Sequence, residues 1–273
     1  MNDTEKTREY IRKRYGEIAK GSGGGGCSSE CCCGAPADAE EAARVLGYTK
    51  ADLDGVADLA NLGLGCGNPV ALAGIREGET VVDLGSGGGF DCFLAARRTG
   101  QAGRVIGVDM TPEMVSLARG NAQKGGYENV EFRLGEIEHL PVADASADVI
   151  ISNCVINLSS DKQQVINEAF RVLRSGGRFC VSDIVATAEL PADIQSDLAL
   201  LAGCVAGAEH TDVMRGMLER AGFTDIRMVP KDNSREILSS WVPGGRVEDH
   251  VASYLIEAVK PGADCACGCG GCC

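Results

Sequence analysis

The chain has 273 residues, of which 44% are apolar and only 4% aromatic, and its formal net charge at pH 7 is −13. That length supplies one large or two small domains with a substantial core. The negative charge argues against a nucleic-acid-binding surface, which needs a basic patch. No run of 18 uncharged apolar residues occurs, and the charged N-terminus lacks the apolar segment of a secretory signal, so we expect a cytoplasmic protein without a membrane span.

Cysteine is unusually abundant, with fourteen copies. Thiols stay reduced in the cytoplasm, so a set of this size indicates metal-binding or catalytic cysteines rather than a disulfide framework. Five stand in the last nine residues, CACGCGGCC, and four in the segment GGGGCSSECCCG near the start. The remaining five are dispersed along the chain and are Cys66, Cys92, Cys154, Cys180 and Cys204.

The first quarter of the chain is predicted to contain helices and glycine-rich loops. Residues 5–19 carry an apolar stripe at helical spacing and predict a helix. The following SGGGGCSSECCCG is predicted to be loop, because glycine and serine at this density support neither helix nor strand periodicity. Short helices are predicted at 38–46 and around 51–60, and the segment 61–69, NLGLGCGNP, is predicted to be a turn ending at a proline.

From residue 80 onward apolar strand-like runs alternate with helical segments, which is typical of a parallel sheet with crossover helices. Five strands are predicted, and they are TVVDLG (80–85), RVIGVDM (104–110), NVEFRLGEI (129–137), DVIISNCVI (148–156) and GRFCVSDIV (177–185).

Helices are predicted after the first, second and fourth of these strands. The second begins with Thr111 as N-cap and Pro112 in its first turn. Residues 190–221 predict two further helical pieces that divide near Gly207. Late strands at 224–232 and 253–261 are expected to be antiparallel at the sheet edge.

The glycine turn VDLGSGGG after the first predicted strand resembles a phosphate-binding loop. Its glycines fall at positions 85, 87, 88 and 89, but the sixth position of the dinucleotide pattern is Phe90, where close helix–strand packing needs glycine or alanine. Asp83, two residues before Gly85, suits a cationic ligand better than a pyrophosphate. S-adenosylmethionine is such a ligand, since it carries an ammonium and a sulfonium.

Other residues at strand ends fit the same cofactor. Asp109 ends the second strand, 24 residues after Gly85, where an acid can accept hydrogen bonds from both ribose hydroxyls. Glu136 and Ile137, after the third strand, are expected to flank the adenine. The other predicted cofactor-site residues are Gly85, Gly87, Met110 and Asn153. A glycine turn with unrelated surface acids explains this arrangement less well, so the sheet is predicted to be of the methyltransferase type.

The dispersed cysteines differ in their settings. Cys154 follows the fourth strand, at the sheet edge where ligands bind. Cys180 lies inside a strand and is predicted to be a packing residue, an interpretation also favoured for Cys92 over a thiol of lowered pKa in a helix's first turn. Small residues flank Cys66 and Cys204, so these thiols could approach a bulky soft atom beside Cys154. Sequence spacing leaves open whether the three meet.

Several segments together resemble the arsenite S-adenosylmethionine methyltransferases, from about residue 61 to about residue 230. SNCVINL and GCVAGA are the most specific; the glycine loop alone would also fit quinone-biosynthesis C-methyltransferases. The segments are GCGNP, VDLGSGGGFDCFLAA, GVDMTPEMVSLAR, SNCVINL, EAFRVLRSGGRF, SDIV and GCVAGA.

The resemblance implies arsenite and methylarsenite as substrates, with trivalent arsenic held by Cys66, Cys154 and Cys204 and methylated by S-adenosylmethionine. It further implies that Cys66 forms a disulfide with an N-terminal cysteine during turnover, which thioredoxin or glutathione then reduces. Candidates for that partner are Cys31, Cys32 and Cys33, with Cys32 or Cys33 favoured. The C-terminal cysteine tail has no counterpart in the family pattern.

The predicted fold class is α/β, a Rossmann-like class I methyltransferase sheet that is mostly parallel with an antiparallel edge strand, plus a small C-terminal α+β region. We expect a helical, cysteine-rich extension at 1–76, a cofactor-binding core at 77–187, a substrate-binding region at 188–261 and a mobile tail at 262–273. Two alternatives remain open. One is a methyltransferase for a small organic acceptor such as a quinone precursor, and the other is a thiol-rich metalloid scavenger.

Overall fold

The computed structural model describes residues 3–21, 39–54, 56, 60–195, 197–241 and 247–262. The cysteines of the N-terminal cluster and of the tail lie outside these described residues, as does the predicted mobile tail apart from Gly262. Within the described part of the chain no helix is both long and apolar enough to cross a membrane.

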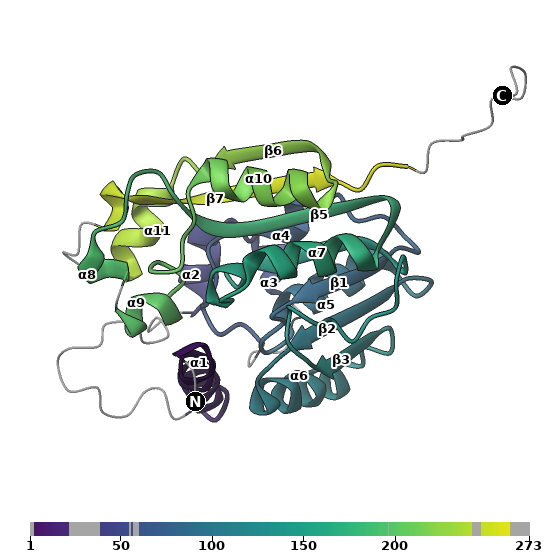
Figure 1. Cartoon of the computed structure of the whole chain (residues 1–273). Coiled ribbons are helices and arrows are strands. Elements are labelled where there is room, and N and C mark those ends of the chain that lie inside the picture. The colour runs from purple at the N-terminus through teal and green to yellow at the C-terminus, as the bar shows by residue number, and fades with distance from the viewer. Residues whose placement is uncertain are drawn as a thin grey trace, which may run out of the picture.

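One seven-stranded sheet organises the fold, in the order β3-β2-β1-β4-β5-β7-β6 (Figure 1). The first five strands pair in parallel, and β7 pairs antiparallel with both β5 and β6. This confirms the predicted fold class. The strands are β1 (Thr80–Leu84), β2 (Arg104–Asp109), β3 (Val130–Leu134), β4 (Ala147–Asn153), β5 (Leu173–Ala186), β6 (Thr224–Pro230) and β7 (Val251–Val259).

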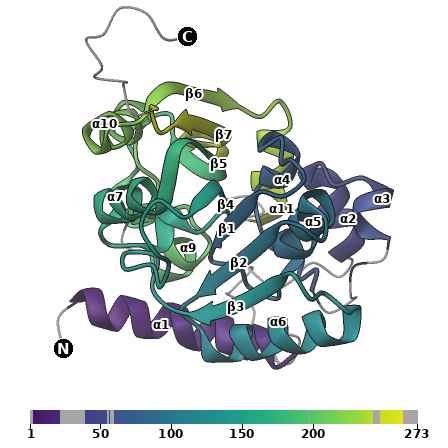
Figure 2. The same ribbon diagram turned by 90° about the vertical axis from the view of Figure 1, so that its right-hand side faces the viewer.

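Helices cover both faces of the sheet (Figure 2). Helices α7 (Lys162–Val172) and α10 (Thr211–Ala221) pack on one face, over a core that includes Phe179. The other face, whose core includes Phe93, carries helices α2 (Ala39–Leu46), α4 (Pro69–Leu72), α5 (Phe90–Thr99), α6 (Pro112–Gly125) and α11 (Ser234–Trp241). Because both faces are covered, the central strands β1 and β4 have nearly continuous apolar sequences.

Two helices lie at the carboxyl-end edge of the sheet and matter for the site. Helix α1 (Asp3–Ala19) runs beside α6 and close to α9 (Leu198–Ala202), as Figures 1 and 2 show. Lys20, directly after α1, forms an ion pair with Glu113 of α6 at 2.9 Å. Short helices α3 (Lys50–Leu53) and α8 (Ala192–Gln195) and the 3-10 turns Ile156–Leu158 and Val247–Asp249 complete the described elements.

Some of the predicted helices are wrong in extent. The helix expected around 51–60 ends at Leu53, because Asp54 has an extended backbone conformation. Only its first turn is stabilised, by reciprocal capping between Thr49 and Asp52. The first piece expected within 190–221 is divided into α8 and α9. Helix α11 is absent from the predictions. Strands β6 and β7, from the predicted substrate-binding region at 188–261, belong to the same seven-stranded sheet as the strands of the predicted cofactor-binding core.

Candidate functional site

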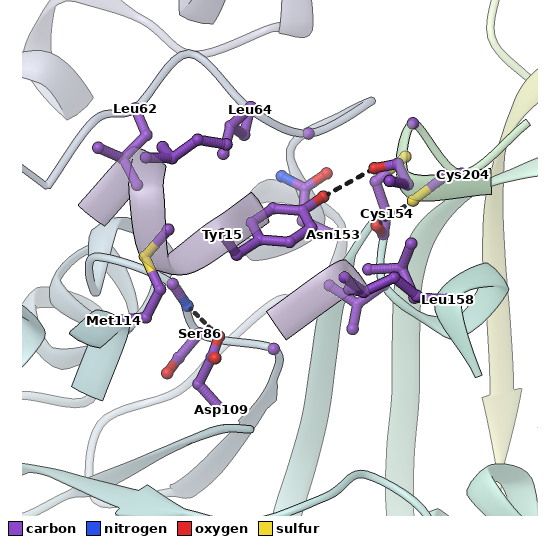
Figure 3. A pocket seen from close by; sticks show the side chains of 18 of the residues that line it. Tyr15, Leu62, Leu64, Ser86, Asp109, Met114, Asn153, Cys154, Leu158 and Cys204 are labelled. Atoms are coloured by element: carbon purple, nitrogen blue, oxygen red, sulfur yellow. Dashed lines mark hydrogen bonds between the residues drawn. The ribbon is translucent and has the colours of Figure 1, made fainter. Parts of the chain in front are cut away.

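A cavity of about 620 Å³ opens at the carboxyl ends of the parallel strands. Its walls come from α1, the glycine loop after β1, the ends of β2 and β4, and the segment that follows α9. In Figure 3 the ring of Tyr15 lies between Asp109 on one side and Cys154 and Cys204 on the other, and its hydroxyl donates to the Ala202 carbonyl at 3.1 Å.

The glycine loop forms the end of this cavity where the predicted cofactor residues lie. Gly85 has φ +70, and a Cβ atom placed there would lie 2.5 Å from the Val155 side chain, so only glycine fits. Gly87 has φ +50 and open space around it, and its N–H donates to Asp109 Oδ2 at 2.9 Å. Thr111 N–H donates to Asp109 Oδ1 at 2.8 Å. Asp109 therefore holds the loop in place while lining the cavity.

Most of the predicted cofactor residues line the cavity; these are Asp83, Gly85, Gly87, Asp109, Met110, Ile137 and Asn153. Glu136 lies outside the lining and pairs with α1 instead, at 3.5 Å from both Arg8 and Arg12. Its neighbour Glu138 does line the cavity and accepts from Ser159 Oγ at 2.6 Å. The sequence carried no signal that distinguishes Glu138 from Glu136, because the loop after β3 has no regular period.

Buried acids surround the glycine loop. Burial, reinforced by the neighbouring Asp91, raises the pKa of Asp83 well above its ordinary value. Cys92 donates its S–H to Asp83 Oδ2 at 3.2 Å, and burial together with that carboxylate raises the pKa of Cys92. The preferred interpretation of Cys92 as a packing residue therefore agrees with the structure, whereas a lowered thiol pKa does not.

Asn153, at the end of β4, connects the glycine-loop end of the cavity to the loop that carries Cys66. Its Oδ1 accepts from Cys66 N–H at 2.9 Å, and its Nδ2 donates to Asp91 Oδ2 at 3.1 Å and to the Tyr48 hydroxyl at 3.0 Å. Gly65 has φ +116, and a Cβ atom there would lie 2.7 Å from Asn153 Oδ1. Glycine at position 65 thus allows the loop that carries Cys66 to approach β4.

The three predicted arsenic ligands meet in one buried cluster. Cys204 donates its S–H to the Cys154 carbonyl at 2.6 Å, and Cys154 and Cys204 line the cavity. Cys66 is completely buried behind them, with its Sγ 3.5 Å from Ser182 Oγ. Sequence spacing left this convergence open.

The backbone at two of these cysteines is strained. Cys154 has φ +61 and Cys204 has φ +64, in the left-handed region that non-glycine residues rarely adopt. Such residues cost about 1–3 kcal/mol each and persist where surrounding structure enforces them, often at functional sites.

The pKa of each thiol that lines the cavity is raised above its ordinary value. Burial raises the pKa of Cys154 well above its ordinary value, and the neighbouring Cys204 and Cys66 raise it further. For Cys204 the hydrogen bond with Cys154 lowers the pKa, but burial outweighs it and the pKa is raised.

Cys66, Cys154 and Cys204 are called the thiol cluster below. The sequence predictions missed two residues that contact it. Asp183 of β5 is fully buried, and one of its carboxylate oxygens lies within 4.8 Å of the sulfurs of Cys66 and Cys154. Asn157, in the turn after Cys154, donates to Asp183, Ile184 and Cys204. The available signals were an acid inside an apolar strand and an amide inside SNCVINL.

Stability is expected to fall between pH 5 and pH 8. Burial raises the pKa of Asp91 to about 6 and that of Asp183 to about 7, against 3.8 ordinarily. The folded protein therefore binds more protons than the unfolded chain through this window, which lowers the free energy of unfolding as pH rises. Urea unfolding in the presence of a reductant should give a free energy of unfolding that is about 4 kcal/mol lower at pH 8 than at pH 5. A level or rising value would contradict these pKa shifts.

Comparison with known proteins identifies the family. Residues 75–222 match the family model described as a methyltransferase domain. An arsenite methyltransferase of Halobacterium salinarum is 52% identical, over 96% of this chain and 68% of that protein. One from Aquipseudomonas alcaligenes is 36% identical, over 81% of this chain and 63% of that protein. The chain thus spans about two thirds of these relatives' length.

A solved structure agrees with both sequence matches. It is that of an arsenic(III) S-adenosylmethionine methyltransferase from Chlamydomonas reinhardtii, which is 35% identical over 84% of this chain and 75% of that chain, with a TM-score of 0.59. The chain belongs to the arsenite methyltransferase family, whose methyl donor is S-adenosylmethionine.

Proposed function

We propose that the protein transfers the methyl group of S-adenosylmethionine to trivalent arsenic bound by Cys66, Cys154 and Cys204. One observation carries the proposal. The thiols of Cys154 and Cys204 line the same cavity as the glycine loop and Asp109, so a methyl donor and a thiol-bound acceptor can share it. The named relatives, which act on arsenite or arsenic(III), support this choice of acceptor.

The residues at the cofactor end fit S-adenosylmethionine. Asp109 is fixed by two backbone amides and can accept from ribose hydroxyls, and the open space around Gly87 leaves room beside it. Asp83 supplies a carboxyl group beneath the loop, toward a cationic methionine end, and apolar Ile137 suits an adenine face. When bound, S-adenosylmethionine supplies an electrophilic methyl group.

The thiol cluster suits arsenous acid as substrate. Exchange of three S–H groups for the three hydroxyls of arsenous acid forms three As–S bonds and releases three waters. Arsenic then keeps a lone pair, opposite its three sulfurs. For methyl transfer this lone pair must face the glycine loop, and the left-handed Cys154 and Cys204 help fix that direction. No general base is required, because the attacking arsenic carries no proton.

Methyl transfer raises arsenic formally from +3 to +5, so a reduction must follow. We propose that an N-terminal cysteine thiolate attacks the Cys66 sulfur bound to the methylated arsenic. The disulfide forms as the As–S bond breaks, and the electrons of that bond stay on arsenic. Thioredoxin or glutathione would then reduce the disulfide, in a reducing cytoplasm. The favoured partners, Cys32 and Cys33, lie outside the described residues.

Methylation can be tested directly. Full-length protein is incubated with arsenite, labelled S-adenosylmethionine and thioredoxin with its reductase, and the arsenic species are separated by chromatography. We expect labelled methylarsenicals. Bound arsenic without labelled product would instead indicate a scavenger. Label transferred only to a demethylated quinone precursor, supplied in a parallel reaction, would indicate an organic acceptor.

A further inference from the structure

Asp183 gives the thiol cluster an oxygen ligand that the proposed methylation does not use. One of its carboxylate oxygens, Cys66 Sγ and Cys154 Sγ all lie within 4.8 Å of one another. All three residues are buried, with 0% of Asp183, 0% of Cys66 and 6% of Cys154 exposed to solvent. Two sulfurs and one carboxylate oxygen at this spacing are a ligand set that tetrahedral zinc accepts.

The carboxylate of Asp183 is held in position by neutral groups. Its Oδ1 accepts from Asn157 Nδ2 at 3.0 Å and from Ile184 N–H at 2.8 Å. Its Oδ2 accepts from Ile156 N–H at 3.0 Å. These three bonds fix the orientation of the carboxylate. A cation bound to it would compensate a charge whose three hydrogen-bond donors named here are all uncharged.

The cluster therefore contains two overlapping ligand sets that share Cys66 and Cys154. Cys204 completes the all-sulfur set, and its Sγ approaches from the cavity side, where it donates to the Cys154 carbonyl. Asp183 completes the mixed set from β5. Trivalent arsenic prefers three sulfurs and keeps a lone pair, whereas a divalent cation has no lone pair to place and readily takes an oxygen ligand.

We propose that a soft divalent cation such as zinc or cadmium binds to Cys66, Cys154 and Asp183 and competes with trivalent arsenic for the two shared thiols. Binding replaces each thiol S–H bond with a metal–sulfur bond and releases two protons to solvent, with no change of oxidation state. The competition rests on the proposed function, but the cation site itself does not.

Cadmium is the probe, measured by titration calorimetry without oxygen. The full chain is used with the nine cysteines outside the described residues replaced by serine, so that only the five described cysteines remain; the replaced residues are Cys27, Cys31, Cys32, Cys33, Cys265, Cys267, Cys269, Cys272 and Cys273. In this background Asp183→Asn should lower cadmium affinity at least about tenfold and leave arsenite affinity within about fivefold. Cys204→Ser should lower arsenite affinity at least about tenfold and leave cadmium affinity within about fivefold.

Unchanged cadmium affinity in Asp183→Asn would overturn the proposal. Because the asparagine variant could lose stability, X-ray absorption on cadmium bound to the same chain with Asp183 retained provides a second measurement. We expect two sulfurs and at least one oxygen around cadmium, and a sulfur-only shell would also overturn the site. Failure of the proposed function is recognised separately, as unaltered arsenite methylation by Cys204→Ser in the chain with all its other cysteines.

Discussion

Replacing Cys154 by serine is expected to lower arsenite methylation at least about 100-fold, and replacing Cys204 by serine should do the same. Serine keeps the shape of the side chain but exchanges a soft sulfur ligand for a hard oxygen, which trivalent arsenic binds poorly. Both thiols line the cavity that the glycine loop also lines, so each substitution removes one proposed arsenic ligand beside the proposed cofactor site. Initial rates with arsenite and affinity for S-adenosylmethionine should be measured on the same preparations, and cofactor affinity should stay within about threefold.

Cys180→Ser is the matched control for these two variants. Cys180 is also buried, with 3% of its surface exposed, but it lies in the core on the other side of β5 from Phe179 and outside the thiol cluster. Its variant should keep arsenite turnover within about threefold of the original protein. If Cys154→Ser or Cys204→Ser methylates arsenite as well as Cys180→Ser does, that cysteine is a packing residue and not an arsenic ligand.

The sheet could be predicted from the sequence because both of its faces are covered. Because the central strands are buried on both faces, their sequences are short apolar runs. These runs, and the helical segments between them, can be recognised in the sequence. Helix α11 was missed because its eight residues are shorter than the window in which helical periodicity becomes clear. The helix predicted at 51–60 was too long because local composition does not reveal where capping ends and an extended residue begins.

The site was predictable where one residue type carries the chemistry. Asp109 ends β2 and the glycines follow β1, and ligands of parallel sheets bind at the carboxyl ends of the strands, so the position of both at one sheet edge could be deduced. The convergence of Cys66, Cys154 and Cys204 depends on how the segments after residue 60 and after α9 return to β4, which no local pattern specifies. Asp183 escaped notice for the same reason, since its neighbours come from other segments.

Asn157 forms hydrogen bonds that connect the turn after Cys154 to β5 and to the segment that carries Cys204. Its Nδ2 donates to Asp183 Oδ1 at 3.0 Å, to the Ile184 carbonyl at 2.6 Å and to the Cys204 carbonyl at 3.0 Å. The residue is completely buried. It therefore fixes the turn after Cys154 against the segment that carries Cys204. We infer that Asn157 positions these two thiols without touching the substrate.

Asn157→Ala is expected to reduce arsenite affinity about tenfold to 100-fold while affinity for S-adenosylmethionine stays within about threefold. The loss leaves buried acceptors without a donor, at about 1–3 kcal/mol for each group that finds no other partner.

Asn157→Asp should be more damaging than Asn157→Ala, because it places a second carboxyl group against Asp183. Asn167→Ala, on the exposed face of α7, is the control and should change neither affinity. Calorimetric titrations with arsenite and with cofactor separate the two sites. Equal losses for both ligands would show that Asn157 supports the whole fold, and no loss for arsenite would show that the Cys204 segment keeps its position without it.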